Sequence, residues 1–252
     1  MATHGPSIVP QLVENTLSVA IGSDSADVLN ALACGAPLSE DLALALLKRS
    51  DLPTEVFEQL SKNTVVAKSR KVKLAIVAHA KAPRYVSLAL IRQLFTFDLM
   101  RVALTPVVPG DVKRAAEEVL INRMESISPG EKLTLARQAS GRIAGELLDS
   151  DDQRIVRVAL ENSRLTDTLV IRALTRPGSS AELAYAVCRH SKWSLRREVR
   201  IALLRNEHTP LTRAVEFSFA LPRALLKEIL QNSRLPGSVK ASILKKHAER
   251  SK

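Results

Sequence analysis

The chain has 252 residues, of which 46% are hydrophobic but only 3% aromatic, and its formal net charge is +11. A chain of this length can bury a core without disulfides or metal ions. A core of small aliphatic side chains favours helices, so the composition argues against a β-sandwich or barrel.

Signals for membrane insertion and secretion are absent from the sequence. No apolar run approaches the roughly 18–20 residues that span a bilayer, so we expect no membrane insertion. No Lys or Arg precedes Lys48, so the basic region that opens a signal peptide is missing. These features favour a cytoplasmic protein, most simply a bacterial one.

The charge is distributed unevenly along the chain. Residues 1–47 contain no Lys or Arg, so all 37 basic residues lie in the remainder. The acids of this first part are Glu14, Asp24, Asp27, Glu40 and Asp41. A basic body of this kind favours an acidic partner: an acidic protein, a nucleic acid or an anionic membrane face. Arg-rich helix faces that only contact solvent are the alternative.

Short segments with the apolar period of a helix follow one another along the chain, with prolines between them. In chain order the clearest are residues 39–49, 84–95, 111–124, 180–190 and 194–205. The SPGE sequence that begins at Ser128 is a capping box and predicts a helix start. Ser179 with Glu182 repeats this pattern, and Thr209 is predicted to cap the helix that follows it. About sixteen short helices and no convincing strand are predicted, which makes the chain all-α.

Two pairs of segments repeat within the chain. VKLAIVAHAKAP (72–83) aligns without a gap with VRIALLRNEHTP (199–210). In the same way ENSRLTDTLVIRAL (161–174) aligns with QNSRLPGSVKASIL (231–244). The repeated unit is a helix, a short loop and a second helix, and one such pair has too little apolar surface to fold alone. Stacked pairs share a core, so the repeats predict an α-solenoid of about eight helix pairs.

A polar residue stands at the end of the first helix in each unit. The alignments place Asn206 at the position of His79, and Asn232 at the position of Asn162. Such a residue is predicted to end the helix by bonding freed carbonyls or by taking a left-handed conformation.

Segments 72–94, 154–174, 196–218 and 224–244 resemble HEAT-like repeats of the leucine-rich repeat variant type. Units of that family read Val-Arg-x-Ala-Val-Ala-x-Asn-x-x-Thr-Pro before a Leu-rich helix, and VRIALLRNEHTP is a close match. The whole sequence is also similar to bacterial helical-repeat proteins. The resemblance implies a right-handed superhelix that binds proteins or nucleic acids. The Cys cluster of the family's iron–sulfur member is missing here, so no cofactor carries over.

The predicted array occupies residues 72–252. Residues 1–60 form an acidic N-terminal helical region that is expected to continue into the array. The polar and basic stretch 61–71 is a candidate hinge between the two.

Residues that could carry chemistry are few. Motifs of P-loop, metalloprotease, serine hydrolase and dinucleotide sites are absent. The five histidines are dispersed, and the acids Asp149, Asp151 and Asp152 precede a helix start, where the helix dipole favours them. Cys34 and Cys188 lie in apolar helical patterns and are predicted to be free, buried thiols. We therefore expect no enzymatic activity, no metal and no cofactor.

Basic residues recur at equivalent positions. Lys73 and Arg200 are equivalent in one alignment, and Arg157 and Lys227 in the other. A row of cations along a solenoid could follow a phosphate backbone or an acidic helix. The alternative is that the long stems of these side chains cover apolar neighbours.

The segment KWSLRREVR (192–200) is the densest basic feature. Arg196, Arg197 and Arg200 are expected on one helix face. Trp193 next to them either stacks on a base or anchors a loop over the core.

These patterns predict a binding scaffold whose basic face holds an acidic protein surface or peptide. Nucleic-acid binding through phosphates is the alternative hypothesis, since the same cations could contact a backbone. HEAT-like DNA glycosylases also grip DNA with a basic surface, but the aromatic and carboxylate groups of their chemistry have no counterpart that we can identify here.

Overall fold

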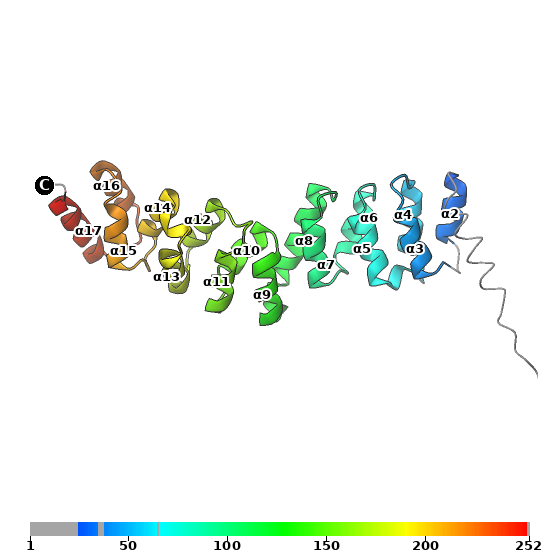
Figure 1. Ribbon diagram of the computed structural model, residues 1–252, viewed down its shortest axis with the longest axis horizontal. Coiled ribbons are helices and arrows are strands. Elements are labelled where there is room, and N and C mark those ends of the chain that lie inside the picture. Colours follow the sequence, from blue (N-terminus) through cyan, green and yellow to red (C-terminus); the bar gives the residue numbers. More distant parts are fainter. Residues whose placement is uncertain (1–24, 35–37, 65, 251–252) are drawn as a thin grey trace, which may run out of the picture. The chain divides into compact units, whose positions relative to one another are not determined.

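The computed structural model describes residues 25–34, 38–64 and 66–250. Within these residues every regular element is helical, with sixteen α-helices and three short 3-10 helices (Figure 1). The prediction of an all-α chain is confirmed. None of the helices described is long and apolar enough to cross a membrane.

The chain divides into two compact units, Met1–Asn122 and Arg123–Lys252. The helices of the first unit are α2 (Ala26–Cys34), α3 (Glu40–Leu46), α4 (Thr54–Lys62), η1 (Val66–Lys68), α5 (Arg70–Ala78), α6 (Arg84–Ile91), α7 (Thr96–Leu104) and α8 (Gly110–Asn122). Helices α2, α4, α6 and α8 pack against one another in this order and form one row, and α3, α5 and α7 form a second row. Successive helices therefore belong to opposite rows, and leucine, valine and isoleucine side chains fill the space between them.

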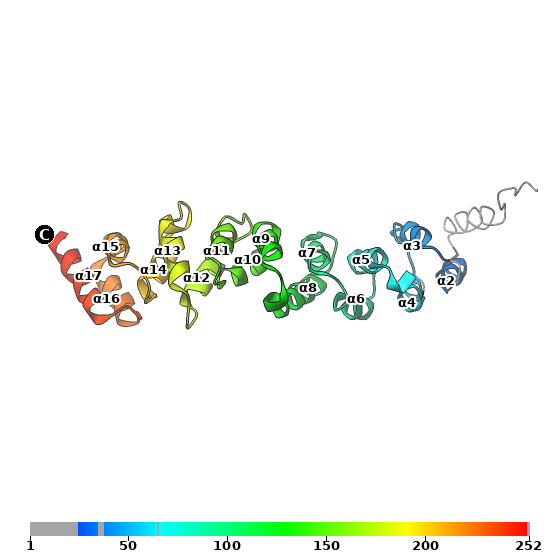
Figure 2. The same cartoon turned by 90° about the horizontal axis from the view of Figure 1, so that it is seen from below.

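The second unit repeats this arrangement. Its helices are η2 (Met124–Ser126), α9 (Pro129–Gln138), α10 (Gly141–Leu147), α11 (Gln153–Leu160), α12 (Asp167–Thr175), α13 (Ala181–Arg189), η3 (Trp193–Leu195), α14 (Arg197–Arg205), α15 (Leu211–Ser218), α16 (Arg223–Gln231) and α17 (Gly237–Arg250). One row contains α9, α11 and α13, and the other contains α10, α12, α14 and α16 (Figure 2). The first of these rows carries the candidate site.

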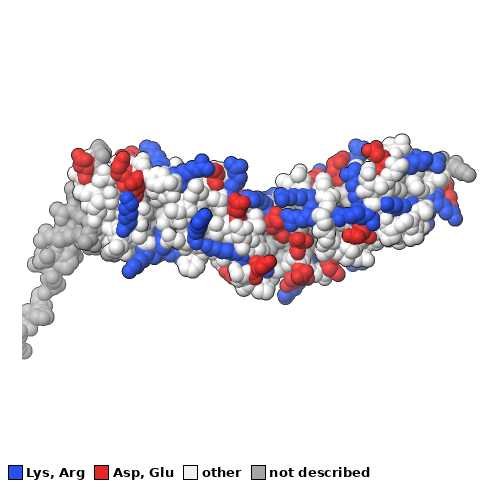
Figure 3. Space-filling view, turned by 180° about the vertical axis from the view of Figure 1, so that it is seen from behind, with Lys and Arg blue, Asp and Glu red and all other residues white. Residues whose placement is uncertain are grey.

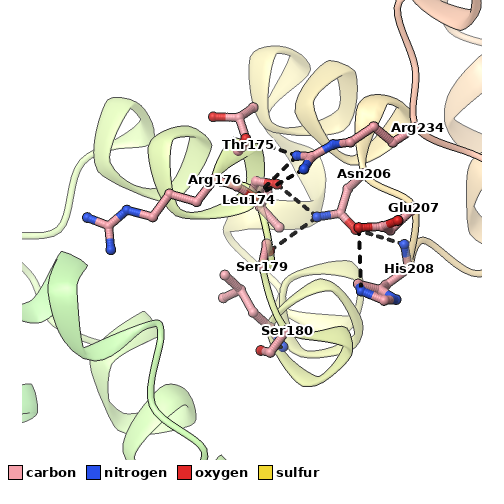
Figure 4. Close-up of polar contacts among 10 residues, drawn as sticks. Leu174, Thr175, Arg176, Ser179, Ser180, Asn206, Glu207, His208 and Arg234 are labelled. Carbon is pink, nitrogen blue, oxygen red and sulfur yellow. Dashed lines mark hydrogen bonds and ion pairs between the residues drawn. The ribbon is translucent and has the colours of Figure 1, made fainter.

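A buried polar side chain ties the end of one helix to an earlier helix of the same row. The amide nitrogen of Asn206, which follows α14, donates to the carbonyl oxygen of Leu174 at 2.8 Å and to the hydroxyl of Ser179 at 3.2 Å (Figure 4). Its amide oxygen accepts from the backbone N–H of His208 at 2.9 Å. We call this arrangement an interhelix cap, because Leu174 lies in α12, two helices earlier.

The interhelix cap recurs in both units. Asn162 donates to the carbonyl of Ala136 at 2.8 Å. In the first unit His79 bonds the carbonyl of Arg49 at 2.8 Å through Nε2. The equivalence of His79 and Asn206 is thus confirmed. Of the two predicted ways to end the helix, carbonyl bonding is the one observed, since no non-glycine residue in the described ranges has a positive φ.

The alignment of Asn162 with Asn232 is wrong by one residue. Ser233 makes the interhelix cap after α16, donating to the carbonyl of Leu204 at 2.7 Å. The side chain of Asn232 is exposed and reaches only a carbonyl of its own helix. Relative to the alignment, α16 ends one residue later than α11, and the loop after it (232–236) is one residue shorter than the loop after α11 (161–166), a difference that identical letters conceal.

Helix starts were predicted with mixed success. The capping box at Ser128 is confirmed, with its hydroxyl accepting from the N–H of Glu131 at 3.4 Å. The second box is displaced by one residue, because Ser180 caps α13 by accepting from the N–H of Leu183 at 3.1 Å. Ser179 is buried and serves the interhelix cap instead.

Two further boundaries differ from the prediction. The helix predicted over residues 194–205 begins only at Arg197, because Trp193–Leu195 forms the separate turn η3. Thr209 does not cap α15, since its hydroxyl donates to the carbonyl of Leu203 at 2.6 Å. The hydroxyl instead adds a second donor to a carbonyl at the end of α14, which also accepts from the backbone N–H of Asn206.

Residues 61–64 and 66–71 contain the end of α4, the turn η1 and the start of α5, and η1 packs against both helices. The boundary between the compact units lies after Asn122. A hinge at 61–71 stays a prediction.

Candidate binding groove

Three helices of one row in the second unit line a groove. Helices α9, α11 and α13 follow one another in this row, and the groove between their exposed surfaces has a volume of about 590 Å³. Its lining residues are Arg137, Gln153, Arg157, Val158, Leu160, Glu161, Tyr185, Ala186, Arg189 and His190.

The floor of the groove is apolar. Leu160 is buried, and Val158 and Ala186 are half-buried beside it. The ring of Tyr185 forms part of the wall and is 45% exposed. A large aromatic side chain left open to solvent beside an apolar floor is typical of a binding surface.

The rim of the groove is basic. Arg137, Arg157 and Arg189 come from three different helices and are all exposed. Within the described part of the chain none of the three forms an ion pair; Arg157 only donates to the side-chain oxygen of Gln153 at 2.9 Å. Their guanidinium groups are therefore available to carboxylates or phosphates, which such planar donors bind in pairs of hydrogen bonds.

His190 is the buried polar group of the groove. Its side chain is only 10% exposed. Its Nδ1 accepts from the backbone N–H groups of Lys192 at 3.2 Å and Trp193 at 3.4 Å. Its Nε2 has no hydrogen-bond partner, although a carboxylate oxygen of Glu161 lies 3.2 Å away.

Trp193 explains why His190 lacks a partner. At the end of α13, His190 stands where an interhelix cap would bond a carbonyl at the end of α11. The indole Nε1 of Trp193 donates to that carbonyl, Leu160, at 2.8 Å. The histidine ring therefore sits at the cap position without a carbonyl for its Nε2.

The proposed binding role of Trp193 is corrected by this geometry. Its side chain is 0% exposed, so the indole cannot stack on a base. The alternative interpretation, a ring that anchors a loop over the core, matches the observed contacts. The ammonium of Lys192 covers one face of the ring at 3.9 Å from its centroid.

The predicted basic group does not form one solvent-exposed cluster, because its members Arg196, Arg197 and Arg200 have different surroundings. Arg200 donates to the carbonyl of Ser194 at 2.6 Å, and its guanidinium lies 5.3 Å from the ring of Phe217. Arg196 lies 3.9 Å from the carboxylate of Asp167. Arg197 is exposed at the start of α14. Arg200 thus stabilises the loop before α14, which its sequence position did not indicate.

The four recurring cations are also divided. Lys73 lies in the first unit and the other three in the second. Within the second unit Arg157 belongs to the row of α9, α11 and α13, whereas Arg200 and Lys227 belong to the row of α14 and α16. On the face seen in Figure 3, acidic side chains lie among the basic ones. Of the predicted binding residues, only Arg157 lines the groove.

Sequence reasoning missed most of the groove. Arg137, Arg189, Tyr185 and His190 lie in or directly after α9 and α13, which contain none of the recurring basic positions identified from the repeats. A search for exposed residues on alternate helices would have been needed to find them.

The described residues offer little for catalysis or metal binding. They contain no cluster of three or more His, Cys, Asp or Glu side chains that could hold a metal ion. Burial raises the pKa of Cys188 to about 11, so its thiol stays protonated and is a poor nucleophile. Asp152 caps α11, and the neighbouring Arg154 lowers its pKa to about 2.

Comparison of the chain with protein-family models, curated proteins and solved structures finds no match. The functional argument therefore starts from the chemistry of the groove.

Proposed function

We propose that the chain is a non-enzymatic binding protein, and that the groove of α9, α11 and α13 holds an acidic polypeptide segment. The observation that carries this proposal is the apolar floor beneath three exposed arginines without carboxylate partners. The proposal includes a cytoplasmic location and an α-solenoid of about eight HEAT-like helix pairs. The contacts between alternate helices within each unit support that architecture.

The chemistry of the groove fits a peptide with both carboxylates and an apolar side chain. Carboxylates of the partner pair with Arg137, Arg157 and Arg189 at the rim. An apolar side chain of the partner enters between Tyr185 and Val158, where it displaces water from the floor. In interfaces with an apolar centre and a polar rim, a few residues at the centre contribute most of the binding energy.

Nucleic-acid binding is the second candidate, favoured by the net charge of +11. Three observations rank it lower. Glu161 places a negative charge at the groove, Trp193 is buried, and Arg157 and Lys227 belong to different rows. A phosphate backbone is repelled by such a carboxylate, whereas the uncharged main chain of a peptide is not.

The experiment is fluorescence anisotropy with a defined ligand. The acidic probe peptide is a short fluorescein-labelled peptide with one Leu flanked on both sides by Glu and Asp. We expect it to bind the full chain, and Arg157→Glu to lower its affinity about tenfold or more, because the substitution places a carboxylate against the ligand's own.

Arg197→Glu is the matched control, since Arg197 is exposed on α14 outside the groove. It should leave the affinity for the acidic probe peptide within about twofold. Labelled duplex DNA, single-stranded DNA and RNA are titrated in parallel across salt. Tighter binding of any of these, weakened by Arg157→Glu, would make nucleic acid the ligand of the groove.

A further inference from the structure

We infer that His190 and Glu161 together bind the main chain of one extended residue of the peptide in the groove: Nε2–H of His190 donates to the carbonyl of that residue, and the Glu161 carboxylate accepts from its N–H. This inference rests on the proposed function and specifies which part of the ligand the groove recognises. It is carried by a buried hydrogen-bond donor without an acceptor, beside an exposed carboxylate.

The hydrogen bonds of the ring define its donor. Because Nδ1 of His190 accepts from two backbone N–H groups, the neutral ring carries its hydrogen on Nε2. That nitrogen is buried and makes no hydrogen bond. A buried donor without an acceptor destabilises the unbound protein, so a ligand that supplies an oxygen gains the full hydrogen bond.

Two other histidines, His79 and His247, show which hydrogen bond is missing at His190. Nε2 of His79 bonds the carbonyl of Arg49 at 2.8 Å, and Nε2 of His247 bonds the carbonyl of Leu221 at 3.0 Å. At His190 the indole of Trp193 occupies the corresponding carbonyl. Nε2 of His190 therefore lacks an acceptor because Trp193 bonds the carbonyl of Leu160, and not because the ring fits loosely.

Glu161 determines which oxygen can reach this donor. Its carboxylate lies 3.2 Å from Nε2, but its side chain is 76% exposed and can rotate away into solvent. A phosphate or carboxylate placed next to Nε2 would meet the negative charge of Glu161. The uncharged main chain of an extended residue avoids this repulsion, because its carbonyl and its N–H point to the same side, the carbonyl to Nε2 and the N–H to the carboxylate. Rotation of the Glu161 side chain away from Nε2 exposes this donor to the ligand's carbonyl. The same rotation leaves the carboxylate beside it, where it can accept from the ligand's N–H.

The test uses the full chain and the acidic probe peptide. Two variants remove one partner each: His190→Asn and Glu161→Ala. Asn is chosen because the amide oxygens of Asn162 and Asn206 accept the N–H two residues further on, at 2.8 Å and 2.9 Å. His190→Asn therefore keeps the loop bond to Lys192 while it removes the ring nitrogen at the groove. We expect either variant to lower affinity about five- to twentyfold.

The ligand is varied in parallel. A series of acidic probe peptides carries an N-methyl group on one main-chain nitrogen at a time, which removes a single N–H donor. One position should lower the affinity of the unmodified protein about tenfold, and the same methylation should have no further effect on Glu161→Ala. His79→Asn is the matched control, because His79 takes the same cap position in the first unit. It should leave the affinity unchanged.

The outcomes separate the two proposals. Binding that is lowered by Arg157→Glu but indifferent to His190→Asn and to every methylation overturns the inference of main-chain recognition and leaves the peptide groove in place. Binding that is insensitive to Arg157→Glu, or no binding of the acidic probe peptide, overturns the groove itself and the inference with it. Loss of affinity with His79→Asn as well would show that the substitution acts through folding, and this too counts against a direct contact.

Discussion

The indole Nε1 of Trp193 donates a 2.8 Å hydrogen bond to the carbonyl oxygen of Leu160, 33 positions earlier in the chain. Both partners are buried, and the bond joins the loop after α13 to the end of α11. It therefore fixes the spacing of the two helices that form most of the groove.

The first prediction removes this bond while it keeps an aromatic ring. Trp193→Phe leaves the buried carbonyl of Leu160 without its donor, so the free energy of unfolding should fall by about 1–3 kcal/mol. Urea denaturation followed by circular dichroism measures the change. An unchanged unfolding midpoint would mean that another donor replaces the indole.

The second prediction concerns the interhelix cap. Asn206 is 1% exposed and bonds two partners outside its own loop, so Asn206→Ala should lower the free energy of unfolding by about 2–3 kcal/mol. Asn232→Ala removes the same side chain where it is exposed, and should change stability by less than about 0.5 kcal/mol. Equal effects of the two variants would contradict a special role for the cap.

The caps also indicate how far the sequence can be interpreted. The polar residues at the ends of helices were predicted correctly at His79 and Asn206, because the local pattern of apolar residues and proline marks a helix end. Which carbonyl they bond could not be predicted, since Leu174 lies 32 positions before Asn206. Errors of one residue at Ser179 and Asn232 arose where neighbouring polar residues can each fill the same role.

The groove was harder to predict than the helices. Its arginines at 137, 157 and 189 are brought together by contacts of alternate helices, which local periodicity does not encode. Trp193 was given two interpretations, stacking on a base or anchoring a loop, because basic residues surround it in the sequence. Its burial depends on the loop after α13 folding over α11, a tertiary contact that the segment alone does not determine.

The third prediction tests the close approach of the start of α10 to the loop after α11. A Cβ atom added at Gly141 would lie 2.2 Å from the carbonyl oxygen of Arg164. That loop is held by the bond from the N–H of Arg164 to Asn162, so it cannot easily move aside. Gly141→Ala should therefore destabilise the protein by about 1–3 kcal/mol in a urea or thermal unfolding experiment.

Gly130 provides the control for this substitution. It also lies in the first turn of a helix, but no atom is within 4 Å of an added Cβ. Gly130→Ala should be neutral or stabilising by up to about 1 kcal/mol, because Ala loses less backbone entropy in a helix. A loss of stability at both positions would argue against the clash at Arg164.

The fourth prediction separates the two thiols. Both were expected to be buried, but Cys34 is exposed at the end of α2 and only Cys188 is buried. The native protein should therefore react with one equivalent of a disulfide reagent such as DTNB at neutral pH, and with a second only after unfolding. Cys34→Ser should abolish the fast reaction, and persistence of that reaction would place the accessible thiol at Cys188.

The last prediction concerns pH. The side chain and N–H of Arg154 bond the carboxylate of Asp152 and lower its pKa from an ordinary value of 3.8 to about 2. A lowered folded-state pKa means that the carboxylate stabilises the fold above its ordinary pKa, and that this stabilisation is lost as the pH falls from about 4 to about 2. Arg154→Ala should raise the pKa of Asp152 towards its ordinary value in a carboxyl NMR titration. Asp51, whose pKa is lowered by its own neighbour Arg49, should titrate as before in that variant. If Asp152 already titrates near 3.8 in the unmodified protein, Arg154 does not hold its carboxylate in solution.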